Sequence, residues 1–272
     1  MRRPSPAAEG ALHPWLAAQL RRPLGDWYRP HLGTAEGLDG TALRLLRQVY
    51  LGLIEEVDHQ VGRLLDHLAH AGLLDRTLVV FTADHGEMAG DHWMLGKSGF
   101  FPQAFHVPLV VRAPGGARGR RVAAFTEHVD LMPTLLEEAG LPIPLQCDGH
   151  ALGAFLRGGQ PGRWRTAVHY EHDVGDLESG WHRTALGLDD DACGLAVRLD
   201  GRHALVAFAG LPDLLFDLER DPGWQVDRSA DPDMAPVRAD LASAMLAWRM
   251  RYADRRLSSA LLTPAGPVGR FE

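Results

Sequence analysis

The sequence has few cysteines, no excess of positive charge and no long apolar run, and each absence excludes a class of protein. Two cysteines in 272 residues cannot form a disulfide framework, which agrees with a reducing compartment. A formal net charge of −7 offers no basic field for DNA or RNA. No apolar stretch is long enough to span a bilayer, and Met1-Arg2-Arg3 leads into prolines. We therefore expect a cytoplasmic protein with neither a membrane nor a nucleic-acid partner.

Chemically reactive side chains are concentrated just after the apolar run Leu78–Phe81. Asp84 and His85 follow this run closely, and a second acid–imidazole pair comes at Asp91 and His92. The run predicts a buried strand that delivers the first pair at its C-terminal end, where open α/β sheets bind ligands. Carboxylate oxygen and imidazole nitrogen both bind divalent cations, so this pair is a candidate metal site for Mn, Zn, Ca or Mg.

Lys97 lies in a glycine-flanked stretch, Gly96-Lys97-Ser98-Gly99, of the kind that allows close approach to an oxyanion. It is a candidate for binding an anionic group, with a solvated surface lysine as the alternative. The Asp84-His85-Gly86 stretch also has a simpler interpretation, an Asx-type turn with a helix cap behind it. His92 and His106 are further site candidates, and for His106 a structural role is the alternative.

The first part of the chain predicts little regular structure and then one long helix. Residues 1–40 are rich in Pro, Arg and Gly and are expected to be irregular, apart from a short helix around His13–Leu20. Over 41–71 the apolar residues recur at intervals of three and four, which predicts one amphipathic helix closed by Gly72.

The region 41–145 predicts one part of an α/β domain that contains the candidate site. Strands are expected at 78–82 and 107–111, and a helix at 131–139 with Asp130 as its N-cap.

The region 146–272 predicts a small antiparallel subdomain with a tail. Short strands are expected near 166–170, 194–199 and 203–208, with a helix around 235–251. The polar stretches 171–173 and 189–191 are expected to be solvated loops. Leu241, Met245 and Trp248 on this helix, with the apolar tail 260–272, motivate the hypothesis of a homo-oligomer.

The run TADHGEMAGDHWMLGKSGFFPQAFHVPLVVRAPG, which starts at Thr82, resembles the metal-site segment of the sulfatase family in the alkaline phosphatase superfamily. Its phosphonate monoester hydrolase branch and the arylsulfatases are most similar. The resemblance implies part of an alkaline-phosphatase-like sandwich with mixed sheets. It also implies that Asp84 and His85 bind the metal, and that Lys97 holds an oxygen of the transferred sulfuryl or phosphoryl group.

One feature of that family has no counterpart in the sequence. The family's nucleophile is a formylglycine made from Cys or Ser in a C/S-x-P/A-x-R motif, and this motif is absent from the chain. Cys147 and Cys193 stand in unrelated contexts. We therefore expect the chain to correspond to a C-terminal piece of the family's domain, without the nucleophile region.

The resemblance implies a metal-dependent hydrolase of sulfate esters or of phosphonate and phosphate mono- and diesters, acting on small ester substrates. Two other functions stay open. The chain could be a catalytically inactive remnant that serves as a binding or oligomerisation module. It could also be a phosphatase or phosphodiesterase with a Ser or Thr nucleophile.

Overall fold

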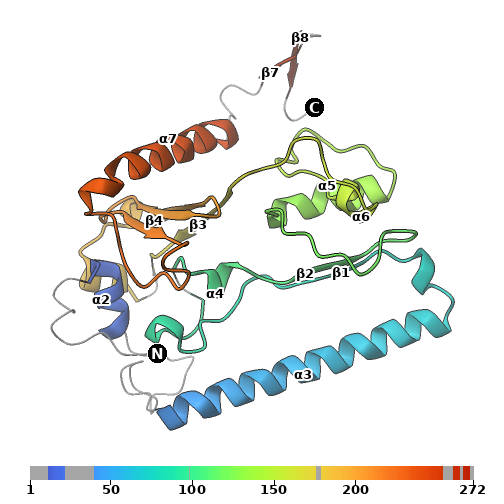
Figure 1. The fold of residues 1–272 in the computed structure, drawn as a ribbon, viewed down its shortest axis with the longest axis horizontal. Helices are drawn as coiled ribbons and strands as arrows, with labels where there is room; N and C mark the ends of the chain where they lie inside the picture. Colours follow the sequence, from blue (N-terminus) through green and yellow to red (C-terminus); the bar gives the residue numbers. More distant parts are fainter. Residues whose placement is uncertain are drawn as a thin grey trace.

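The computed structural model describes residues 12–21, 40–97, 99–175, 179–253, 260–263 and 266–269. Helix α2 (Pro14–Arg21) confirms the short helix expected near His13–Leu20. The rest of the segment predicted to be irregular lies outside the described residues. Helix α3 (Gly40–His70) confirms the long helix, and it runs along one side of the molecule (Figure 1).

Two antiparallel strands follow α3 and the short turn η3 (Leu74–Arg76). Strand β1 (Val79–Thr82) pairs with β2 (Leu109–Arg112) as a two-stranded sheet. The strand at 78–82 was expected to be buried, but no residue of β1 is fully buried, and Phe81 is 37% exposed. The reason is that β1 has a single pairing partner among the described residues and that α3 leaves part of its surface uncovered.

The segment after β2 forms a capped turn and two helices, η5 (His128–Asp130), α5 (Leu131–Glu138) and α6 (Gly153–Leu156). Asp130 occupies the N-cap position of α5, as predicted, but its side chain makes no capping bond to that helix. It instead accepts the backbone N–H of Glu127 at 2.9 Å, as one half of the capping box of η5. The carboxylate of Asp130 is fully buried against Arg165.

The C-terminal region contains a four-stranded antiparallel sheet in the order β3-β4-β5-β6. The strands are β3 (Val168–Asp173), β4 (Gly194–Leu199), β5 (His203–Phe208) and β6 (Leu214–Asp217). Three of them confirm predicted strands, whereas β6 was not expected. The stretch 171–173 was predicted to be a loop but belongs to β3, because its backbone pairs with residues 194–196 of β4.

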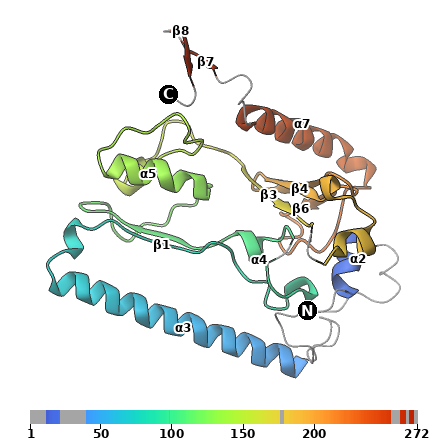
Figure 2. The same ribbon diagram turned by 180° about the vertical axis from the view of Figure 1, so that it is seen from behind.

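Both faces of this sheet are covered, as the view from behind shows (Figure 2). Helix α7 (Ala235–Tyr252) packs Leu241 and Met245 against Leu205 and Leu215 on one face. These two helix side chains, which motivated the homo-oligomer hypothesis, are therefore buried within their own chain. The alternate residues of the strands, among them Val206, point to the opposite face.

That opposite face packs against the loop between β1 and β2. The aromatic and sulfur-containing side chains of this loop enter the main core together with a tryptophan of α2; they are Met88, Met94, Phe100, Phe101 and Trp15. The connecting loop is thus anchored in the C-terminal sheet although its two strands belong to a different sheet.

The remaining elements are short. They are helix α4 (Pro102–Phe105), the turns η4 (Asp91–Trp93), η6 (His182–Leu186), η7 (Asp190–Ala192) and η8 (Pro232–Met234), and the hairpin of β7 (Ala260–Thr263) with β8 (Gly266–Gly269). Among the described residues, no helix is both long enough and apolar enough to cross a membrane.

The overall class is α/β, with separate helices and antiparallel sheets, as the sequence predicts. The division of the chain into three regions, with boundaries after residues 40 and 145, stays a prediction.

Candidate functional site

The backbone after β1 is fixed by a close approach of helix α4. The N–H of Gly86 donates to the carbonyl oxygen of Ala104 at 2.7 Å. A Cβ atom at position 86 would lie 2.0 Å from the carbonyl oxygen of Gln103, so no residue larger than glycine fits without a shift of the backbone. This contact sets the direction in which the two preceding residues, Asp84 and His85, leave the strand.

The loop that leads to Lys97 is closed by a carboxylate. Glu87 Oε1 accepts the backbone N–H of Ala89 at 3.0 Å and that of Gly96 at 2.6 Å. Met88 donates its N–H to the carbonyl oxygen of Gly96 at 2.9 Å, so the two ends of the loop lie side by side. Lys97 is thereby returned to the region of Asp84 and His85 from a position well beyond them in the sequence.

Asp84, His85 and Lys97 form a cluster at the C-terminal end of β1. His85 Nε2 lies 2.7 Å from Lys97 Nζ and 3.4 Å from Asp84 Oδ2. The Asp84 side chain is 84% exposed, so its carboxylate is available to a ligand from solvent. The structure therefore brings together the three residues that the sequence selects as metal ligands and oxyanion contact.

A backbone carbonyl sets the protonation pattern of His85. Its Nδ1 lies 2.9 Å from the carbonyl oxygen of Gly86, which accepts a hydrogen bond and cannot donate one. The proton of a neutral imidazole therefore sits on Nδ1, and Nε2 presents its lone pair towards Asp84 and Lys97. This is the tautomer that a metal-binding histidine needs.

The two weaker candidates lie in different surroundings. His92 is buried, with its ring stacked on Phe101 at a centroid distance of 3.6 Å, and burial lowers its pKa to about 4. It adopts a left-handed backbone conformation with φ of 50°, as do its neighbours Ala89 and Trp93. His106 is exposed and ends helix α4, where its N–H donates to the carbonyl oxygen of Pro102 at 2.7 Å.

His172 is a residue near Lys97 that sequence reasoning placed in a solvated loop. It shares a face of β3 with Tyr170, and its ring meets the edge of Phe105 at a centroid distance of 6.0 Å. Burial lowers the pKa of His172, and the positive charge of Lys97 adds to this effect while Asp173 opposes it. The alternation of side chains along β3 is the signal that could have found it.

A second contact to the strand end comes from His128, whose Nε2 lies 3.1 Å from Thr82 Oγ1. His128 is held in place by the capped turn η5. There Glu127 Oε1 also accepts the backbone N–H of His169 at 2.7 Å, which ties this turn to β3. Neither His128 nor His172 is close to Asp84 in the sequence.

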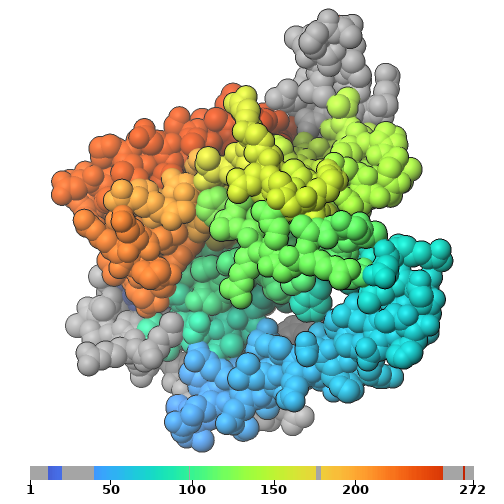
Figure 3. Space-filling model, turned by 45° about the vertical axis from the view of Figure 1, so that its right-hand side comes forward, coloured from blue at the N-terminus to red at the C-terminus, as the bar shows by residue number. Residues whose placement is uncertain are grey.

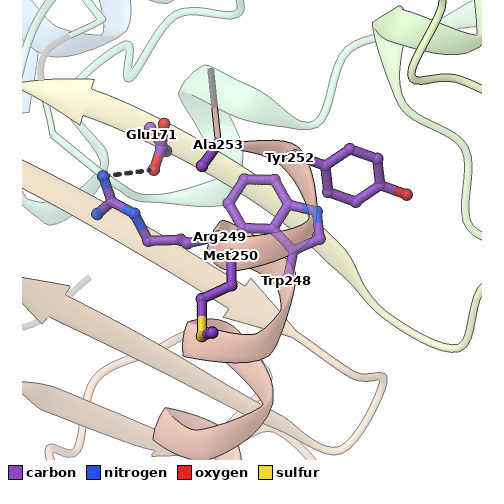
Figure 4. Close-up of a pocket in the computed structure, with 6 residues that line it drawn as sticks. All are labelled: Glu171, Trp248, Arg249, Met250, Tyr252 and Ala253. Carbon is purple, nitrogen blue, oxygen red and sulfur yellow. Dashed lines mark ion pairs between the residues drawn. The ribbon is translucent and has the colours of Figure 1, made fainter. Parts of the chain in front are cut away.

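An open hollow of about 510 Å³ lies between the end of α7 and β3 (Figure 4). Its lining contains Trp248, Met250 and Tyr252, and an ion pair of 3.4 Å joins Arg249 to Glu171 across it. The single carboxylate in this lining is already paired with a cation. The hollow therefore does not offer a set of metal ligands.

The described residues contain part of a metal site at most. Among them, no group of three or more His, Cys, Asp and Glu side chains is arranged to hold a metal ion. Asp84 and His85 provide two donors of the right chemistry, and a divalent cation requires further ligands from elsewhere.

Comparison with known families gives two matches that together extend over most of the chain. The sulfatase family model matches residues 18–141. The model of the C-terminal part of N-sulphoglucosamine sulphohydrolase matches residues 90–251. The second match alone covers more than half of the chain.

Individual relatives agree with these families. The multifunctional alkaline phosphatase superfamily protein PehA of Trinickia caryophylli is 39% identical over 99% of this chain and 53% of its own length. Arylsulfatase K of Rattus norvegicus is 32% identical over 51% of this chain and 24% of its own. Among solved structures, the phosphonate monoester hydrolase of Agrobacterium radiobacter matches with a TM-score of 0.88 and 43% identity.

The alignments with PehA and with the Agrobacterium hydrolase cover nearly all of this chain but only about half of each relative. The Agrobacterium alignment covers 98% of this chain but 54% of the hydrolase chain. The chain thus spans about half the length of PehA and of this hydrolase.

Proposed function

Since the chain belongs to the sulfatase family of the alkaline phosphatase superfamily, we propose that it takes part in metal-dependent hydrolysis of sulfate esters or of phosphonate and phosphate esters. The observation that carries the proposal is the convergence of Asp84, His85 and Lys97 at the exposed end of β1. Asp84 and His85 are the proposed metal ligands, and Lys97 is the proposed contact to the oxyanion.

The donor atoms of this cluster suit a divalent cation. His85 Nε2 carries a lone pair because Nδ1 is bonded to the carbonyl oxygen of Gly86. Asp84 presents carboxylate oxygens to solvent. Mn, Zn, Ca and Mg all accept such donors, and the complete ligand shell selects among them.

A bound divalent cation would supply Lewis acidity that polarises an ester oxygen. Lys97 adds a fixed positive charge beside it, which stabilises negative charge that develops on a sulfuryl or phosphoryl oxygen. Glu87 supports this role because it closes the loop that positions Lys97. Gly86 supports it by holding the metal-ligand pair against α4.

One feature of the sequence supports a competing function, that of a binding module without turnover. The chain contains no C/S-x-P/A-x-R motif, so the formylglycine nucleophile of the family has no source in it. Under this alternative the cluster binds a metal or an anionic ester but does not cleave it.

Metal titration of the purified chain tests the proposed ligands. We expect Asp84→Asn and His85→Ala each to weaken Mn²⁺ or Zn²⁺ binding at least about tenfold in calorimetry, because each removes a donor. Asp91→Asn is the matched control, since Asp91 belongs to the other Asp-His pair and is bonded to Arg47. Equal losses in Asp84→Asn and Asp91→Asn would contradict the assignment.

Turnover separates the hydrolase from the binding module. Aryl sulfate and aryl phosphonate monoesters are offered to the metal-loaded chain, and the released phenol is measured. Hydrolysis that is lost in Lys97→Met, with metal binding retained, supports the hydrolase. Metal binding with no hydrolysis in the chain or in its assembly with a nucleophile-bearing partner favours the binding module.

A further inference from the structure

Lys97 directs its ammonium group at an imidazole and not at a carboxylate. Its Nζ lies 2.7 Å from Nε2 of His85, and among the described residues no carboxylate lies within ion-pair distance of it. A lysine ammonium carries three donors and no acceptor, so Nζ donates and the lone pair of His85 Nε2 accepts. A cation of the chain itself therefore holds the atom through which His85 is proposed to bind a metal.

His85 has one lone pair available for these two uses. Its Nδ1 donates a proton to the carbonyl oxygen of Gly86 at 2.9 Å, which leaves Nε2 as the only acceptor of the ring. A zinc ion bound to an imidazole nitrogen lies about 2.0–2.1 Å from it. The ammonium of Lys97 is only 2.7 Å from the same nitrogen, so the two cations cannot be present there together. Lys97 has to leave before a metal ion binds.

The side chain of Lys97 can move while its backbone stays in place. Gly96 is bonded on both sides, because Glu87 Oε1 accepts its N–H at 2.6 Å and its carbonyl oxygen accepts the N–H of Met88 at 2.9 Å. The side chain of Lys97 is exposed and has a flexible four-carbon stem. Figure 3 shows the segment after β1, in blue-green, at the molecular surface beside α3. Release from His85 therefore needs the rotation of one side chain and no rearrangement of the loop.

Electrostatics sets the position to which the released ammonium moves. A divalent ion on His85 repels the positive charge of Lys97, whereas an anion between them attracts both cations. A sulfuryl or phosphoryl group has several oxygens, so one can face the ion while another accepts a hydrogen bond from Lys97. Release of Lys97 thus links metal binding to anion binding, and such a linkage acts in both directions.

We propose that Lys97 competes with the metal ion for His85 Nε2, and that metal binding releases Lys97 to the oxyanion. The metal ion binds before the ester, and each strengthens the binding of the other. This inference rests on the proposed function, because it takes Asp84 and His85 as the metal ligands. It adds an order of binding that the assignment of ligands does not contain.

Calorimetry with Zn²⁺ tests the competition. We expect Lys97→Met to bind Zn²⁺ at least about threefold more tightly than the unchanged chain, because methionine cannot donate to His85 Nε2. A residue that supports the metal site would have the opposite effect when it is replaced. Unchanged or weaker Zn²⁺ binding in Lys97→Met would overturn the proposal.

Arg47→Met is the matched control for the loss of a positive charge. Arg47 donates to the carbonyl oxygen of Ala89 at 2.9 Å and to Asp91 Oδ1 at 2.7 Å, so it is a second cation on the same loop. Its recorded bonds do not include His85. We expect its Zn²⁺ affinity to stay within about twofold of the unchanged chain, because solvent screens its charge. Equal tightening in Arg47→Met and Lys97→Met would count against a specific competition.

Nuclear magnetic resonance separates the hydrogen bond from simple charge repulsion. The nitrogen-15 signal of His85 Nε2 is recorded before Zn²⁺ is added and is identified by its loss in His85→Ala. We expect the signal to differ between the unchanged chain and Lys97→Met, since the lone pair loses its donor. Tighter Zn²⁺ binding without any change in this signal would mean repulsion alone and would overturn the proposal.

Inorganic sulfate tests the release of Lys97 to an oxyanion. Sulfate should tighten Zn²⁺ binding by the unchanged chain at least about threefold, because it draws the ammonium away from His85. The effect should be smaller in Lys97→Met, which has no ammonium to release. Equal effects of sulfate in the two proteins would overturn this part of the proposal.

The outcomes for the exchange and for the hydrolase are distinct. Competition with the expected signs in a protein that hydrolyses no ester supports the exchange and counts against the hydrolase. Equal Zn²⁺ binding by the unchanged chain and Lys97→Met, with weaker binding in Asp84→Asn and His85→Ala, supports the proposed ligands and overturns the exchange. Absence of Zn²⁺ binding in all of these proteins would overturn both.

Discussion

The two sheets of this molecule have similar apolar strands but opposite surroundings. In the C-terminal sheet, Val197, Val206 and Leu205 are fully buried, because α7 covers one face and the site loop covers the other. In the β1–β2 sheet, Val110 is 62% exposed. The difference shows that apolar sequence alone does not create a core, and that a second layer must be present to receive the side chains.

The site lies at the boundary between these two regions. Its loop is anchored in the buried core through Met88 and Met94, whereas Asp84 and His85 extend from the bare sheet. A loop anchored in the core, next to an exposed strand end, keeps the two candidate ligands and Lys97 together and leaves Asp84 open to a ligand from solvent.

The largest expected effect comes from truncating equivalent leucines in the two regions. Leu205→Ala should lower the free energy of unfolding by about 4 kcal/mol, because it leaves a cavity between α7 and the sheet. Leu53→Ala should change it by less than about 0.5 kcal/mol, since its side chain is 59% exposed. Urea denaturation measures both. A loss of more than about 2 kcal/mol of unfolding free energy in Leu53→Ala would show that the apolar face of α3 is buried in solution.

A somewhat smaller effect is expected at the junction of the regions, where Arg165 pairs with the buried carboxylate of Asp130. Arg165 Nη2 lies 2.6 Å from Asp130 Oδ1, and its Nη1 contacts the other oxygen. Arg165→Met should cost about 3 kcal/mol of unfolding free energy, because it leaves Asp130 buried without its partner.

Arg157→Met is the matched control for this prediction. Arg157 pairs with Glu137 and Glu138, but its side chain is 58% exposed, so its loss should cost less than about 1 kcal/mol. Similar losses of unfolding free energy in Arg165→Met and Arg157→Met would mean that the ion pair of Arg165 with Asp130 is solvated and does not hold the two regions together.

The sequence predicted those parts that depend on local pattern. Helices α3 and α7 and strand β1 were found because apolar spacing and glycine placement are local signals. The end of β3 was missed because its polar residues resemble a loop, whereas pairing with β4 decides its structure. Strand β6 was missed although its residues are mostly apolar, because it is only four residues long and its pairing with β5 defines it. The exposure of α3 was missed as well, since its apolar spacing predicts a covered face but does not say where the cover comes from.

The candidate site likewise contains residues that a local motif predicts and residues that only the tertiary structure reveals. Asp84, His85 and Lys97 lie within one short segment, so a single motif predicted all three. His172 reaches the same region from β3, and His128 reaches Thr82 from the turn before α5. Only the tertiary structure brings these side chains together.

The smallest expected effect is a pH dependence confined to the buried region. Burial lowers the pKa of His92 from 6.5 to about 4, and burial with Arg198 and Arg165 lowers that of His169 equally far. Between pH 6.5 and 4 the unfolded chain binds more protons at these two histidines than the folded chain does. Their contribution to the free energy of unfolding is therefore complete above pH 6.5 and is lost as the pH falls through this window. We expect each histidine to contribute about 2 kcal/mol of this loss.

Urea denaturation of variants at pH 7 and pH 4.5 measures this contribution. His92→Gln should reduce the difference in unfolding free energy between the two pH values, because glutamine does not titrate. The control His59→Gln removes an exposed histidine of α3 and should leave the difference unchanged. If His59→Gln reduced it as much as His92→Gln, the α3 region would be packed like the C-terminal sheet, and the contrast between the two regions would fail.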